Sequence, residues 1–283
     1  MANFFERLRN GWNLALTSLD ILQENKSLLL FPVLSSISLL LIFFSFAGGL
    51  FALETQFHFL EVLKNSGTET GNEILLYALV FVFYFINYTV IVFFNMALVH
   101  CTRIYLEGGQ PTVSDGISFS NSRISTIIKW SLLSATVGVV LKVIEDKSEK
   151  LGAFIASLVG MLWAILTFFV VPVLAYENVG PIDAVKRSGA IMREKWGEAL
   201  GANFGFGFIK LIIFVLCLVG GVITAYLVHP LAGIALGLIV FLGASIAISA
   251  AEVVFVAAAY QYTQNKPTGS FDTKVLDNLF APK

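Results

Sequence analysis

The residues with the clearest potential for chemistry are one carboxylate and one amine beside long apolar segments. Glu252 lies within Ser-Ala-Ala-Glu-Val-Val at positions 249–254, and Lys210 stands at the edge of the preceding apolar segment. An ionisable residue inside a membrane span is a candidate functional site, because a charge in lipid is costly. Counted from His229-Pro230, Lys210 lies about twenty residues back and Glu252 about twenty-two forward, so antiparallel helices bring them to nearly the same depth. We therefore predict an ion pair that joins the last two spans.

The predicted Lys210–Glu252 pair has two interpretations, one structural and one functional. In the first, the pair only holds two helices together; in the second, Glu252 handles a proton or a substrate. Residues 231–251 carry no charge and already suffice to cross a bilayer, which takes roughly 20 apolar residues. Glu252 can then sit at the inner interface, which favours the structural interpretation. Asn87 and Asn95, in an earlier apolar segment, are expected to hydrogen-bond neighbouring helices.

Motifs of catalytic or cofactor-binding sites are missing from the sequence. It contains no Walker loop, HExxH, GxSxG, CxxC or dinucleotide fingerprint. His100, Cys101 and Arg103 cluster near the end of one apolar segment without the spacing of metal ligands. We expect no catalytic residue, no metal and no cofactor, and a membrane-embedded enzyme ranks last among the function classes. A net charge of −1 gives no reason to expect binding of nucleic acid.

The composition is that of a membrane protein. Apolar residues make up 57% of the chain and charged residues 13%, whereas soluble domains carry roughly 25% charged residues. Five apolar segments are long enough to span a bilayer as helices. They lie at residues 28–53, 74–100, 151–176, 203–228 and 231–260, with a turn at His229-Pro230, since proline cannot continue a helix interior.

A sixth span is predicted at residues 127–144, from topology rather than hydropathy. Only residues 130–141, between Lys129 and Lys142, are uncharged, a length that is equally typical of an interfacial or re-entrant segment. If the segment crosses, most of the 18 Lys and Arg residues lie on the cytoplasmic side, in agreement with the positive-inside rule. We therefore predict six spans with both termini in the cytoplasm.

An amphipathic segment precedes each pair of spans, at residues 3–25, 114–128 and 181–197. In the first, apolar residues recur at steps of three and four from Phe5 to Leu22, which is typical of a helix. This order predicts an all-α, polytopic membrane protein with six transmembrane helices in three amphipathic-helix-plus-hairpin units. A cytoplasmic tail at residues 262–283 follows the last span.

The three units suggest an internal repeat, in which the order of elements is the main evidence. The first and third amphipathic segments also align without gaps: Ser18, Ile21 and Glu24 correspond to Ser188, Ile191 and Glu194. Gly233 and Gly237 form a GxxxG pattern, which permits close backbone approach between helices. That approach can occur within the chain or in a homo-oligomer, and the sequence does not separate the two.

The amphipathic segments are expected to lie in the inner leaflet, with basic side chains near anionic headgroups. The candidate lipid-headgroup contacts are Arg7, Arg9, Lys186, Arg187, Arg193 and Lys195. A simpler interpretation is that these charges only set the topology, and it is the favoured one. Specific lipid recognition stays open beside it.

Residues 170–188, followed by Trp196, resemble the recurrent signature of a loose group of bacterial six-helix membrane proteins. In that group a span ends near a proline, here Pro172, an acidic residue follows, here Glu177, and an Ala-x-x-x-Ser helix, here at 184–188, leads to a tryptophan. The group includes uncharacterised membrane proteins and the membrane domain of some glycerophosphodiester phosphodiesterases. The resemblance implies a protein of the bacterial cytoplasmic membrane with the three-unit plan. It implies no catalytic residues, because the phosphodiesterase chemistry belongs to a separate soluble domain.

Two functions are weighed. The leading hypothesis is a non-enzymatic accessory, scaffold or assembly component that acts through its helix faces and inner-leaflet amphipathic helices, with a protein partner or as a homo-oligomer. The alternative is a transporter or channel for a small solute or lipid with Glu252 in the pathway, suggested by the repeat and by Gly-Gly pairs that can interrupt spans. The repeats run parallel and the polar residues do not converge on a midplane site, which favours the first hypothesis.

Overall fold

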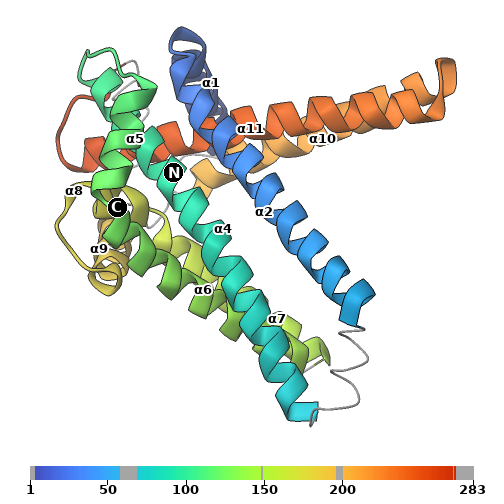
Figure 1. Cartoon of the computed structure of the whole chain (residues 1–283). Helices are drawn as coiled ribbons and strands as arrows, with labels where there is room; N and C mark the ends of the chain where they lie inside the picture. Colours follow the sequence, from blue (N-terminus) through green and yellow to red (C-terminus); the bar gives the residue numbers. More distant parts are fainter. Residues whose placement is uncertain (1–3, 58–68, 148, 196–199, 270, 272–283) are drawn as a thin grey trace.

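The computed structural model describes residues 4–57, 69–147, 149–195, 200–269 and 271, and these are helical with short connections (Figure 1). The helices are α1 (Phe4–Glu24), α2 (Ser27–Phe57), α4 (Glu69–Leu106), α5 (Val113–Ser122), α6 (Ile124–Lys147), α7 (Glu149–Thr167), α8 (Val170–Tyr176), α9 (Pro181–Lys195), α10 (Leu200–Leu227) and α11 (Pro230–Thr263). Six segments among the described residues are long and apolar enough to cross a membrane. This confirms the predicted all-α fold and the predicted number of spans.

The weak sixth span is α6, and it begins earlier than the predicted range of 127–144. Its candidate span covers Ile124–Asp146, so the helix continues through Lys129 and Lys142. The preceding amphipathic helix, expected at 114–128, is shorter, because α5 ends at Ser122. There the N–H of Arg123 bonds the Ser120 carbonyl at 3.0 Å and closes a tight turn in a run of serine and asparagine, which are weak helix formers. Residues 124–128 therefore belong to the span.

The segment predicted as one span at 151–176 is divided into α7 and α8. Pro172 lacks an N–H, and its ring clashes with the carbonyl four residues earlier, that of Phe168, which is where the helix is interrupted. The N–H of Phe169 at this break donates to the Ser188 hydroxyl of α9 at 2.9 Å. Ser188 is fully buried. The interrupted backbone offers the Phe169 N–H no helical partner. The Ser188 side chain of the amphipathic helix α9 accepts this hydrogen bond instead.

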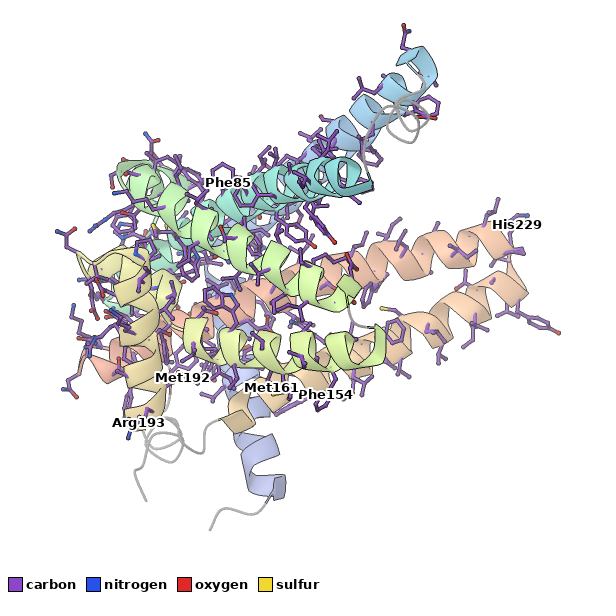
Figure 2. The ribbon with its side chains drawn as sticks, turned by 90° about the horizontal axis from the view of Figure 1, so that it is seen from below. Phe85, Phe154, Met161, Met192, Arg193 and His229 are labelled. Atoms are coloured by element: carbon purple, nitrogen blue, oxygen red, sulfur yellow. The ribbon has the colours of Figure 1, made fainter. Side chains whose placement is uncertain are left out.

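The buried side chains gather at one end of the molecule, which we call the base. The base consists of α1, α5, α8 and α9 packed against the adjoining ends of α4, α10 and α11, and its core includes Leu22, Met96, Leu174 and Phe255. From the base the long helices diverge: α10 and α11 run side by side away from α4, α6 and α7 (Figure 1), and His229 lies at their far tip (Figure 2). Leaving out Gly233, the buried residues of α11 begin only at Ile248.

Contact between α10 and α11 rests on glycines. A Cβ atom placed on Gly233 would lie 2.3 Å from the Gly221 carbonyl oxygen, and one on Gly237 would lie 3.3 Å from the Cys217 carbonyl oxygen. The GxxxG pattern of Gly233 and Gly237 is therefore used within the hairpin. Such close approach compensates for the lack of a hydrophobic gain between helices in lipid.

We predict that Gly233→Ala lowers the free energy of unfolding in mild detergent by about 1–3 kcal/mol, because the added methyl group meets backbone that cannot turn away. The matched control is Gly243→Ala in the same helix, where an added Cβ meets nothing within 4 Å. Equal stability of the two variants would show that the hairpin is not held at Gly233.

Candidate binding site at the Lys210–Glu252 pair

The structure brings together the two residues of the predicted ion pair. Lys210 on α10 places its Nζ 2.6 Å from Oε1 of Glu252 on α11, and the two side chains are 45% and 33% exposed. At 1.5 Å per helical residue, the pair lies about 26 Å along α10 and about 33 Å along α11 from the His229-Pro230 turn. A bilayer core is about 30 Å thick, so a hairpin that turns at one interface carries the pair to the other. By this count we expect the pair at headgroup depth rather than at the midplane.

A cavity of about 270 Å³ opens beside Glu252, where α4, α10, α11 and the junction of α7 and α8 meet. Asn95 of α4 contributes a second polar side chain to its wall, and the phenyl rings of Phe168, Phe206 and Phe255 contribute aromatic surface. Pro172, at the helix break, is part of the same wall. The cavity therefore combines a carboxylate, an amide and aromatic rings next to an exposed ammonium group.

Both asparagines of α4 are expected from the sequence to hydrogen-bond neighbouring helices, and the structure places each of them differently. Asn87 donates from Nδ2 to the Phe83 carbonyl of its own helix at 2.7 Å. Asn95 lines the cavity beside Glu252.

His100 stacks on Phe119, with ring centroids 3.9 Å apart, and the buried Cys101 thiol bonds the Thr112 carbonyl. The described residues contain no group of three or more potential metal ligands.

A network of polar and aromatic side chains, which the sequence analysis missed, joins the helix ends at the base. One part is built on Glu107, directly after α4. Its Oε1 accepts from Arg103 Nε at 2.8 Å and from Gln261 Nε2 of α11 at 3.4 Å. The Arg103 guanidinium also lies 4.6 Å from the centre of the Tyr176 ring of α8. The hydrogen bond from Arg103 is the main cause that lowers the pKa of Glu107, and it outweighs burial, which acts in the opposite direction.

The second part of the network is built on Glu177, directly after α8. Its Oε1 accepts from Arg187 Nε of α9 at 3.1 Å and from the Tyr260 hydroxyl of α11 at 3.0 Å. The Tyr260 ring stacks on Tyr176 with centroids 6.1 Å apart, and the Tyr176 hydroxyl donates to the Val99 carbonyl of α4. Each carboxylate of the network thus connects an arginine to α11, so the ends of all three hairpins are tied together.

Sequence signals for this network exist but are short. Tyr176-Glu177 and Tyr260-Gln261 both place a tyrosine before a hydrogen-bonding side chain at the end of a span. Such pairs are also frequent at membrane interfaces, where tyrosine is enriched for its amphipathic ring. The pairs therefore become informative only when the structure shows that they meet.

The predicted lipid-headgroup contacts occupy different situations. Lys186 pairs with Asp183 at 3.0 Å on the exposed side of α9, and Arg187 is engaged by Glu177. Arg193 lies at the outer end of α9 (Figure 2) and shares with Lys186 the wall of an open groove between α9 and α7, beside Leu166. The side chains of Arg7, Arg9 and Lys195 lie outside the described residues.

Together, the six candidate spans and the helical base define an integral, multi-pass, α-helical membrane protein. Within that class the chain belongs to the DUF6159 family, a family of unknown function, whose family model matches residues 74–270. The match covers α4 to α11, and so includes the Lys210–Glu252 pair and the network at the base. No curated protein matches the chain.

We predict that Glu107→Gln destabilises the protein at neutral pH, because the neutral amide cannot keep the charged hydrogen bond to Arg103. The pKa of Glu107 lies below its ordinary value of 4.5, so its stabilising contribution is present above that value and is lost as the pH falls through the lowered pKa. The difference in melting temperature between wild type and variant should therefore narrow on acidification below 4.5. A difference that stays constant into strong acid would contradict this assignment.

Proposed function

We propose that the protein is a non-enzymatic accessory, scaffold or assembly component of the bacterial cytoplasmic membrane, with both termini in the cytoplasm. In this role it binds another membrane protein, or a second copy of itself, through helix faces within the bilayer. The basic amphipathic helices hold the base at an anionic inner leaflet, with Lys186 and Arg193 near the headgroups.

The observation that carries this proposal is the uncovered hairpin of α10 and α11. Most of its large apolar side chains between Leu211 and Leu242 are exposed, for example Leu216 at 64% and Val222 at 61%. The glycine contacts of the hairpin are already used between its own two helices. It therefore extends from the base as a preformed two-helix element whose outer faces are available to a partner.

The location of the polar groups supports an accessory role over a path across the bilayer. Several charged and hydrogen-bonding side chains of the described residues meet at the base, in the networks of Glu107 and Glu177. Others, Lys142 with Glu145 and Asp146, pair within the last turns of α6. Between α2, α4 and α6 lies a groove of about 530 Å³ whose wall is mostly apolar, although Glu54, Tyr84 and Lys142 also belong to its lining. Such a groove accepts lipid chains or an apolar helix rather than a hydrophilic solute.

We predict that native mass spectrometry after mild extraction detects a stoichiometric protein partner or a second copy. Leu216→Trp on α10 should then reduce partner occupancy about tenfold, which corresponds to about 1.4 kcal/mol of lost packing. The matched control is Leu41→Trp on α2, since both leucines are 64% exposed. Absence of any partner from gentle extracts would contradict the accessory role, and an equal effect of both variants would contradict the assignment to the α10–α11 hairpin.

A second candidate function is a transporter for a small solute or lipid, favoured by the cavity that Asn95 and Glu252 share. Under this alternative, proteoliposomes should show a pH-sensitive flux that Glu252→Ala abolishes. Under the accessory role, a broad panel of solutes and lipids gives no flux, and Lys210→Ala and Glu252→Ala lower stability or partner binding instead. A Glu252-dependent flux would replace our proposal with the transport function.

A further inference from the structure

We infer that Lys210, Glu252 and the cavity beside them bind the headgroup of a zwitterionic phospholipid that carries a phosphate and an ammonium group. This site goes beyond the accessory role and does not depend on it. It also requires no movement of lipid across the membrane, which separates it from the transport alternative.

The charges of the pair match the two charges of such a headgroup. A lysine ammonium has three hydrogen-bond donors and a carboxylate has two acceptor oxygens. The contact between Lys210 Nζ and Glu252 Oε1 uses one donor and one oxygen, and both side chains stay partly exposed. Lys210 can therefore bind the phosphate while Glu252 binds the ammonium, and the two opposite charges remain side by side.

The wall of the cavity suits the ammonium end of the headgroup. Besides Glu252 it carries the Asn95 amide, whose oxygen accepts hydrogen bonds, and the rings of Phe206 and Phe255, which lie 5.8 Å apart. Aromatic faces attract cations that have left bulk water, and such contacts are worth more when desolvated. The combination of one carboxylate, one amide and aromatic rings is selective for an ammonium group over a second phosphate.

The size and depth of the cavity indicate a lipid. A volume of about 270 Å³ falls just below the range of about 300–1,000 Å³ that is typical for whole ligands, so it suits a headgroup whose chains remain outside. The pair lies at headgroup depth, and the exposed side chains of Leu211 and Phe214 continue from Lys210 along α10 into the apolar region. Acyl chains can follow these exposed side chains along α10.

The Lys210–Glu252 pair carries no net charge, which also distinguishes this site from the groove on α9. An anionic headgroup would satisfy Lys210 but would leave the Glu252 carboxylate facing an unpaired negative charge, which is unfavourable in an apolar wall. The groove beside Lys186 and Arg193 has the opposite character, with two cations of which one has a neighbouring acid. We therefore assign the zwitterionic lipid to the Lys210–Glu252 site alone.

The test is a lipid titration of the purified full-length protein, followed by native mass spectrometry, with phosphatidylethanolamine and phosphatidylglycerol of the same acyl chains. We expect the wild type to retain one phosphatidylethanolamine at least about tenfold better than phosphatidylglycerol. The double variant Lys210→Glu, Glu252→Lys keeps a neutral ion pair between α10 and α11 but puts the cation in the cavity wall, where the ammonium group of the lipid is assigned. It should therefore lose the preference while its melting temperature stays close to that of the wild type. Asn95→Leu should weaken retention.

A matched control is the exchange Lys142→Asp, Asp146→Lys on α6, which reverses an ion pair of 2.9 Å. Lys142 lies in the wall of the groove between α2, α4 and α6 and not in the cavity beside Glu252, so the preference should persist. Equal retention of the two lipids by the wild type, or an unchanged preference in the Lys210→Glu, Glu252→Lys variant, would overturn the proposal. A further arm of the experiment measures whether soluble phosphoethanolamine binds the protein and competes with the lipid. Binding as tight as that of the lipid would overturn the assignment to a membrane lipid, and failure to compete at equal concentration supports it.

Discussion

Apolar helices in a bilayer gain little hydrophobic free energy by packing together, because lipid chains are as apolar as their side chains. This constraint explains where the molecule is packed and where it is open. At the base, α1 and α9 remove apolar surface from contact with water, and the buried core is found there. Beyond the base, α10 and α11 diverge from α4, α6 and α7, and the two helices of this hairpin approach most closely where glycines let their backbones meet.

The same constraint gives the polar groups at the base their importance. Where apolar packing does not choose one arrangement of hairpins over another, hydrogen bonds and charged pairs with defined partners can do so. Glu107 and Glu177 each connect an arginine to a side chain of α11, and the stacked rings of Tyr176 and Tyr260 lie between them. The geometry of the cavity beside Glu252 follows from this arrangement, because α4, α8 and α11 form its walls.

Much of the fold was predictable because length and hydropathy alone identify spans. The number of six spans is found as expected. A shorter helix precedes each hairpin, although the second one ends at Ser122 rather than at residue 128. The break between α7 and α8 was not predicted, although Pro172 is visible in the sequence, because a proline in a membrane helix is tolerated where neighbours satisfy the backbone. Here that neighbour is Ser188, which is distant in the sequence and on another helix. The internal repeat stays a prediction.

The candidate site was predictable in part. Antiparallel counting from His229-Pro230 places Lys210 and Glu252 at one depth, and the structure has them in contact. Depth alone says nothing of a third helix, so the contribution of Asn95 to the same cavity could not be derived. The network at the base was missed for the same reason, because its members lie on hairpins whose relative rotation is not encoded in hydropathy.

The position of α1 has a consequence for how the chain is made. This helix is synthesised before α10 and α11, yet it packs against both of them. Its apolar face, with Leu14, Ile21 and Leu22, therefore has no final partner while four spans are inserted. During that interval we expect this amphipathic helix to lie at the membrane surface. Assembly of the base is thus coupled to insertion of α10 and α11. Before that step, the attachments of α1 are the membrane surface, the adjoining α2 and the hydrogen bond that Tyr105 of α4 donates to Glu24.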